Sequence, residues 1–129
     1  MTGEIFSAEL TIDNADEIRD FYSAVLGWSS QGLDMGGYED YVMLRDGETP
    51  VAGICHARGV NTGIPPQWLI NVIVDDLDRS LAECISRGGE QVTHIRGEQG
   101  QWRHVVIRDP AGAVMALLEG SVEAPEEAS

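Results

Sequence analysis

The chain has 129 residues, a formal net charge of −14 and 43% hydrophobic residues, enough to fill the core of one domain. This acidity argues against nucleic acid or an anionic membrane as a partner, because phosphates would be repelled. No apolar run approaches the roughly 20 residues that a membrane span needs, and the N-terminus lacks a secretory pattern. Cys55 and Cys84 fit no metal-binding spacing. A cytoplasmic protein with reduced thiols is therefore predicted.

The first half of the chain predicts one helix and several strands. Apolar residues at helical spacing predict a helix over 15–26, which Gly27 ends in a left-handed conformation. Asn14 followed by Glu17 has the spacing of a capping box at the start of this helix. Alternating or continuous apolar residues predict strands at residues 5–12, within 28–37, and at 41–45 and 51–56.

The second half repeats the same order of elements. A helix is predicted over 77–87, behind the acidic pair Asp75-Asp76, and 62 positions separate Asp13 from Asp75. The segment 41–46 also resembles 104–109. Strands are predicted at residues 68–74, 91–95, 103–108 and 114–118, with a loop at 97–100.

The repeat predicts an α+β fold in which two βαβββ modules follow one another within a single domain, residues 1–120. The modules cover about 5–57 and 68–119, and the Gly- and Pro-rich segment 58–67 links them. The acidic segment 121–129 is expected to be disordered.

Two motifs connect this pattern to a known family. They are the run DFYSAVLGW at 20–28 and the later turn DPAG at 109–112, each in its module's expected place. With them the sequence resembles the vicinal oxygen chelate superfamily, the glyoxalase/bleomycin resistance/dioxygenase fold, and most closely its glyoxalase-like subgroup. The resemblance implies a cupped mixed β-sheet around a central cleft, with the helices outside, and a homodimer.

The resemblance also implies four metal-ligand positions, one on each of four strands. Counting from the helix caps and the turns places them at Ser7, Gly53, Leu69 and Ala116. None of these side chains supplies the imidazole or carboxylate donors that a divalent metal needs, so no metal cofactor is expected. The alternative is a rearranged metal site that uses Glu119 and Glu9 with a histidine.

The same positions predict an open ligand site. Glu9 and Asn71 lie two residues beyond the first and third positions and hence on the same strand face. A carboxylate and an amide there would bind a ligand's amine or hydroxyl, or Glu9 would serve as a general base. The other reading is a solvated Glu9 at the cleft rim. The remaining residues expected to line the cleft are Ser7, Gly53, Leu69, Ala116 and Trp68.

Other candidates have simpler interpretations. His56, His94 and His104 lack ligand spacing and are expected to be exposed or hydrogen-bonded residues. Cys55 and His56 should point to opposite faces of one strand. Trp68, like the other tryptophans, is as well explained by core packing or a subunit contact.

The favoured function is metal-free binding of a small organic molecule, for which the acidity suits a cationic ligand. The alternative is a lyase or isomerase of the glyoxalase type, either metal-dependent with rearranged ligands or metal-free with Glu9 as base. An interaction module with an unused cleft is the third reading. The identity of the ligand does not follow from the sequence.

Overall fold

The computed structural model describes residues 3–97 and 102–120. The predicted loop at 97–100, apart from Gly97, and the predicted disordered segment 121–129 lie outside these ranges. The chain divides into two compact units. The N-terminal unit is Ser7–Trp68, and the C-terminal unit runs from Leu69 onward together with the residues before Ser7.

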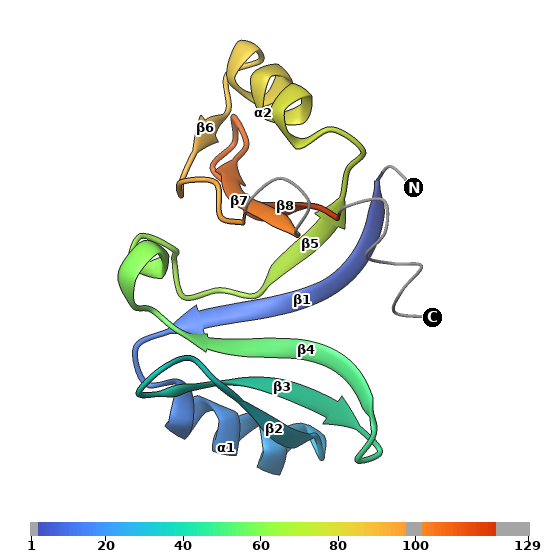
Figure 1. The fold of residues 1–129 in the computed structure, drawn as a ribbon, viewed down its shortest axis with the longest axis vertical. Coiled ribbons are helices and arrows are strands. Elements are labelled where there is room, and N and C mark those ends of the chain that lie inside the picture. The colour runs from blue at the N-terminus through green and yellow to red at the C-terminus, as the bar shows by residue number, and fades with distance from the viewer. Residues whose placement is uncertain (1–2, 98–101, 121–129) are drawn as a thin grey trace. The chain divides into compact units, whose positions relative to one another are not determined.

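The N-terminal unit is a four-stranded sheet with one helix (Figure 1). Its strands lie in the order β2-β3-β4-β1. β4 is parallel to β1, whereas β3 is antiparallel to both β2 and β4. Its elements are β1 (Glu4–Ile12, which begins before the unit), α1 (Ala15–Leu26), β2 (Ser29–Asp34), β3 (Glu39–Arg45), β4 (Thr49–His56) and the short 3₁₀ turn Gly59–Asn61.

The C-terminal unit has the same plan. Its strands lie in the order β5-β8-β7-β6, with β5 parallel to β8 and the other pairs antiparallel. Its elements are β5 (Leu69–Ile73), α2 (Leu77–Ser86), β6 (Glu90–Gln91), β7 (Arg103–Arg108) and β8 (Val114–Glu119). The prediction of an α+β fold built from a repeated βαβββ unit is therefore confirmed. No helix in the described part of the chain is long and apolar enough to cross a membrane.

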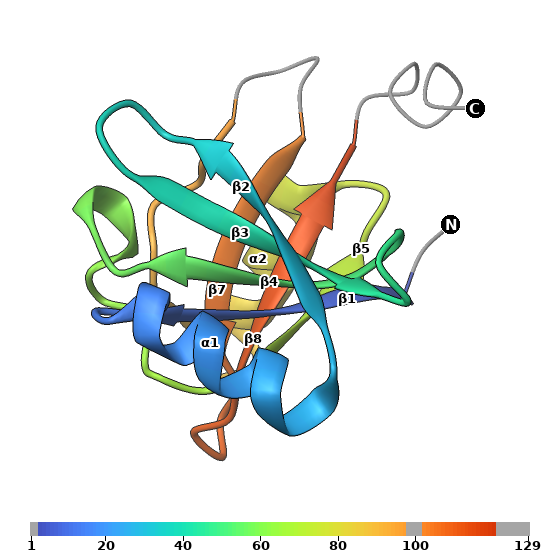
Figure 2. The same cartoon turned by 90° about the horizontal axis from the view of Figure 1, so that it is seen from below.

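Each helix covers one face of its own sheet, and Figure 2 shows α1 lying against the strands of the N-terminal unit. The strand alternation sends every second side chain under the helix, and these side chains form the core. In the N-terminal unit the buried cluster is Ala15, Tyr41, Met43, Ala52 and Ile54. In the C-terminal unit it is Val74, Leu77, Val105, Ile107 and Leu117. Each unit thus has one covered face and one face without a helix of its own.

The helix ends agree with the sequence except at one cap. Asp76 accepts a hydrogen bond from the Arg79 amide at 3.1 Å, as an N-cap should. Asn14 occupies the N-cap of α1 without capping it, so the expected capping box is wrong. Its amide instead donates to the Glu17 carboxylate at 3.3 Å, so the contact joins two side chains and not a side chain to the backbone. Gly27 ends α1 at φ 78°, as predicted.

The strand predicted at 91–95 is wrong in most of its length, because β6 stops at Gln91. The Val106 amide of the neighbouring strand donates to the Thr93 hydroxyl at 3.0 Å. A side chain thereby satisfies the group that a continuing strand would have bound through its backbone. Regular pairing is interrupted there and returns only as the single bridge between Arg96 and His104.

Candidate functional site

The uncovered face of the N-terminal unit carries the predicted carboxylate. Leu10 is 4% exposed and belongs to the buried set, so its neighbour Glu9 points to the opposite face of β1. Glu9 pairs directly with Gly53 of β4, and Gly53 pairs with Val42 of β3. Residues paired in this way share a face. The structure therefore places a half-buried carboxylate beside a glycine, in a row that crosses three strands.

Gly53 has room for a small side chain beside Glu9. A Cβ atom added at Gly53 would meet only the Glu9 Cβ at 3.7 Å and the Tyr41 carbonyl oxygen at 3.8 Å. Both are ordinary van der Waals contacts, so neither the backbone nor close packing requires glycine here. Ser7 lies on the same face, two residues before Glu9. Small side chains thus flank Glu9 along its own strand and on the next one.

Cys55 also lies on this face and was not predicted as part of the site. Its thiol donates to Glu9 Oε2 at 3.8 Å, a distance that suits a sulfur donor. Its neighbour His56 contacts Asp40 instead, so the expected separation of Cys55 from His56 is confirmed. Only the pairing of β1 with β4 brings Cys55 to Glu9, and the sequence carries no signal for that register.

In the C-terminal unit, the other predicted positions lie on the corresponding face. Asn71 pairs with Ala116, and Ala116 pairs with Val106. All three are buried, and Leu69, on the same face of β5, is 1% exposed. Each unit thus contains some of the residues that were expected to line the ligand site.

Trp68 lies apart from the Glu9 row within the N-terminal unit. Its indole Nε1 donates to the Tyr22 hydroxyl of α1 at 3.0 Å. Its ring meets those of Tyr22 and Trp28 edge to face, at centroid distances of 5.2 and 6.1 Å. These contacts place Trp68 against the core under the helix. Core packing, the alternative reading of this residue, fits its position better than ligand contact.

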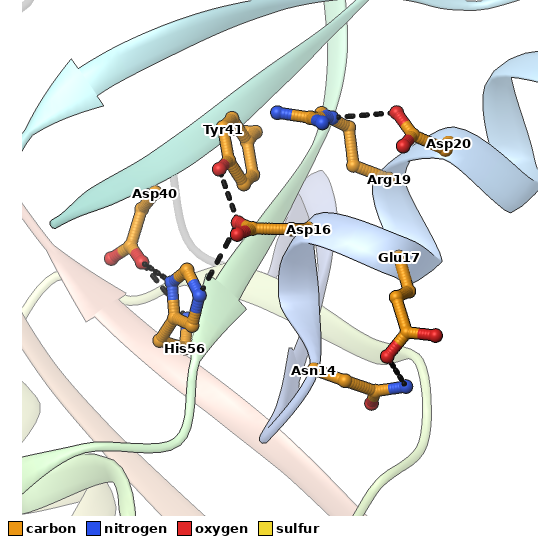
Figure 3. A network of polar contacts seen from close by, with 8 residues as sticks. All are labelled: Asn14, Asp16, Glu17, Arg19, Asp20, Asp40, Tyr41 and His56. Carbon is orange, nitrogen blue, oxygen red and sulfur yellow. Dashed lines mark hydrogen bonds and ion pairs between the residues drawn. The ribbon is translucent and has the colours of Figure 1, made fainter.

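A second polar group lies at the start of α1, where the sequence predicted only a capping box (Figure 3). The Tyr41 hydroxyl donates to the Asp16 carboxylate. The His56 ring stands between two carboxylates, 3.5 Å from Asp16 and 3.4 Å from Asp40. The His56 backbone amide also donates to Asp40 at 2.8 Å. The network fastens the first turn of α1 to β3 and β4.

The C-terminal unit has an equivalent built from different residues. Arg103 of β7 contacts Asp78 in the first turn of α2 at 3.1 Å and Glu119 of β8 at 3.2 Å. Glu119 in turn accepts from the Leu77 amide at 2.8 Å. The hydrogen bond from Arg103 lowers the pKa of Asp78. Because both units fasten the same helical turn to the sheet, we interpret both networks as structural.

The Tyr41 contact gives a testable pH dependence. The hydrogen bond to the Asp16 carboxylate, and after it burial, raise the pKa of Tyr41 above its ordinary value. A raised folded-state pKa stabilises the fold fully below the unfolded pKa of about 10, and the contribution is lost as pH rises through the folded pKa. In an alkaline titration of tyrosinate absorbance, Asp16→Asn is expected to lower the Tyr41 midpoint. The Tyr41→Phe variant identifies that midpoint, and an Asp16→Asn curve identical to the wild type would contradict the assignment.

Among the described residues, no group of three or more His, Cys, Asp or Glu side chains is placed to hold a metal ion. Glu119, proposed for a rearranged metal site, is engaged with Arg103 and the Leu77 amide. His104 lies beside the Arg96 guanidinium, which donates to its Nδ1 at 2.8 Å. The expectation of a metal-free protein stays a prediction.

Several curated proteins are similar to this chain. It is 28% identical over 118 residues to "Putative glyoxylase CFP32" of Mycobacterium bovis, covering 92% of this chain and 44% of that protein. It is 31% identical over 117 residues to the anthracycline biosynthesis protein DnrV of Streptomyces peucetius, covering 91% of this chain and 42% of that protein. The chain therefore spans less than half the length of these curated relatives.

Solved structures share the fold at low sequence identity. Methylmalonyl-CoA epimerase from Mycobacterium tuberculosis matches with a TM-score of 0.52 and 18% identity, over 93% of this chain and 89% of that one. The Mn(II)-bound glyoxalase from Novosphingobium aromaticivorans matches with a TM-score of 0.57 and 17% identity, over 93% and 41%. Identities this low establish the fold alone.

The family assignment comes from the sequence as a whole. The model of the glyoxalase-like domain matches residues 9–118, which span both repeats from the Glu9 strand to the end of β8. This is most of the chain, and it agrees with the repeated βαβββ plan and with the motifs at 20–28 and 109–112. The chain belongs to the glyoxalase-like domain family, within the vicinal oxygen chelate superfamily.

Proposed function

We propose that this protein binds a small organic molecule on the uncovered face of its N-terminal unit, with Glu9 as the main polar contact. The observation that carries the proposal is the pairing of the half-buried Glu9 with Gly53, where a side chain could be added without a close contact. Ligand sites are typically apolar surfaces with a few placed polar groups. Val42 and Gly53 provide the apolar surface, and Glu9 and Cys55 provide the polar groups.

The charge of the site indicates a ligand with a donor group, and an ammonium group most of all. A partly buried carboxylate is costly unless it is paired or hydrogen-bonded. A ligand ammonium would add a charge-assisted hydrogen bond to Glu9 beyond the weak one from Cys55. The net charge of −14 would also raise the rate at which cations arrive. Two relatives bear names from anthracycline biosynthesis.

The proposal is tested by titrating the protein with a panel of amine-bearing natural products while following tryptophan fluorescence and heat. The panel includes an aminosugar anthracycline, with its amine-free aglycone as the matched control. At least one amine is expected to bind, and its amine-free counterpart is expected to bind at least tenfold more weakly, because the loss of a charged hydrogen bond costs about 1.5–3 kcal/mol.

Glu9→Gln provides the control on the protein side, since it keeps the size of the side chain and removes its charge. It is expected to weaken amine binding by about tenfold or more and to leave the binding of the aglycone unchanged. Equal binding of both compounds to both proteins would contradict a role for Glu9. No response across the whole panel would contradict binding of this class of ligand.

General-base catalysis by Glu9 is the second candidate, and the Cys55 contact favours it. A carboxylate that already accepts from a thiol at 3.8 Å is positioned to exchange protons with a bound substrate. This reading predicts proton exchange at carbon in a bound carbonyl compound, measured as deuterium incorporation from heavy water. Glu9→Gln would abolish the exchange, whereas pure binding produces none with either protein.

The remaining expectations stay proposals. A cytoplasmic location, the absence of a metal and a homodimer follow from composition and from the family resemblance. Metal analysis of the purified protein tests the absence of a metal, since stoichiometric Zn, Ni, Fe or Mn would overturn that expectation.

A further inference from the structure

The row of residues that contains Glu9 continues across the whole sheet of the N-terminal unit. Glu9 of β1 pairs with Gly53 of β4, which pairs with Val42 of β3. Val42 in turn pairs with Gln31 of the outermost strand, β2. Because paired residues share a face, these positions form one row across four strands that lie side by side in Figure 1. Gln31 therefore lies on the face that carries Glu9.

The burial of neighbouring residues supports this placement of Gln31. Tyr41 and Met43 of β3 belong to the core cluster under α1, and they pair with the two neighbours of Gln31 in β2. Those neighbours lie on the helix-covered face, so Gln31 lies on the opposite one. Gln31 is also exposed, and its amide is therefore accessible to a ligand on the uncovered face.

The row has polar side chains at its two ends and apolar positions between them. Glu9 carries a carboxylate at one end, and Gln31 carries an amide at the other. Gly53 and Val42 lie between these two residues. Leu33, two residues along β2 from Gln31 and 45% exposed, adds apolar surface on the same face. An apolar surface with a few placed polar groups is typical of ligand sites.

We infer that Gln31 is the second polar contact of the ligand and selects ligands that carry two polar groups. This inference rests on the proposed function, in which Glu9 binds an ammonium group. Three strand spacings separate Glu9 from Gln31, roughly 14 Å in all. Hydrogen bonds at both ends bring the polar groups of a ligand lying between them to about 9 Å apart. The ligand class is an elongated amine with a hydrogen-bonding group at its far end.

Linear diamines of increasing length test this spacing within one chemical series. Diaminobutane is too short to reach from Glu9 to Gln31, whereas diaminooctane is long enough, and octylamine has the same length with a single amine. In calorimetric titrations, Gln31→Ala is expected to weaken the binding of diaminooctane about threefold, because it removes one hydrogen bond to the far ammonium. It is expected to leave the binding of diaminobutane and octylamine unchanged.

Gln31→Glu gives the larger expected effect, because it places a second carboxylate at the far end of the row. The affinity for diaminooctane is expected to rise at least tenfold, since each ammonium then has a charged partner. Diaminobutane and octylamine are expected to gain much less. Adding Glu9→Gln to this variant is expected to remove the gain for diaminooctane, because only one of its two ammonium groups then meets a carboxylate.

Ser30→Glu is the matched control for the added charge. Ser30 is exposed and adjacent to Gln31 in β2, but it lies on the helix-covered face. This variant is expected to bind diaminooctane and diaminobutane with the wild-type ratio of affinities. An equal gain for Ser30→Glu, or an equal gain for the short and the long diamine with Gln31→Glu, would mean general attraction by the added charge and would overturn the inference.

The inference and the proposed function fail in different ways. If Glu9→Gln weakens amine binding but neither Gln31 variant changes the preference for diaminooctane, Gln31 is not a ligand contact and the proposed function stands. No binding of any diamine to Gln31→Glu would also overturn the inference, and the amine panel would still decide the proposed function. If Glu9→Gln alters the binding of no amine at all, the proposed function fails and the inference fails with it.

Discussion

Replacing Gly53 with leucine is expected to abolish binding of whichever panel compound the wild-type protein binds. The leucine side chain would occupy the space beside the Glu9 carboxylate, on the face that α1 does not cover. A loss of at least a hundredfold is expected, because overlap with a bound ligand admits no small adjustment. Calorimetric titration of the folded variant measures it.

The Gly53→Ala variant separates two effects of a substitution at this position. One is the loss of space for a ligand, and the other is a change in the backbone conformation. An added Cβ makes only contacts of 3.7 and 3.8 Å, so Gly53→Ala is expected to fold normally. Its free energy of unfolding should rise slightly, since glycine weakens a strand interior by about 0.5–1 kcal/mol relative to alanine. Binding is expected to fall by less than tenfold. If leucine and alanine weaken binding equally, the ligand does not occupy this space.

A matched control exists elsewhere in the same unit. Gly63 also has room for a side chain and no positive φ, and it lies outside the sheet. Gly63→Leu is therefore the same chemical change at a site that the proposal leaves out. It is expected to leave affinity unchanged, and a loss of affinity equal to that of Gly53→Leu would contradict the placement of the site.

The fold was predictable because its signals are local. Apolar residues follow helical spacing in both halves, Gly27 ends the first helix, and both helices begin where the sequence places them. The face of Glu9 was predictable for the same reason, since strand alternation needs only the position of the strand. The Asn14 cap failed because two arrangements of the same side chain compete locally.

What the sequence could not supply is the pairing of distant segments. Cys55 reaches Glu9 across 46 positions and Tyr41 reaches Asp16 across 25, and both depend on strand register. The sequence similarity between residues 41–46 and 104–109 predicts equivalent positions that differ by one residue from those in the structure. Tyr41 pairs with Ile54, and the residue in the corresponding place of the second unit is Val105, which pairs with Leu117. The register of β3 against β4 also shifts between Met43 and Leu44.

A substitution at the start of α2 is expected to have a large effect on the free energy of unfolding. Leu77 is fully buried and belongs to the cluster under that helix. Leu77→Ala is expected to lower the free energy of unfolding by about 3 kcal/mol, through lost burial and the cavity left behind. Urea denaturation with an unchanged m-value measures it. Leu26→Ala in α1, at a position that is 50% exposed, is the matched control and is expected to cost less than about 0.5 kcal/mol.

The equivalent position of the first repeat holds a smaller residue. Ala15, 62 positions before Leu77, is also fully buried, but there the aromatic ring of Tyr41 belongs to the same cluster. Ala15→Leu is therefore expected to overpack that core and cost about 1–3 kcal/mol, although it copies the residue that the second repeat uses. If Ala15→Leu were neutral, the two cores would be interchangeable at this position. The different polar networks at the first turns of α1 and α2 would then be the main difference between the repeats.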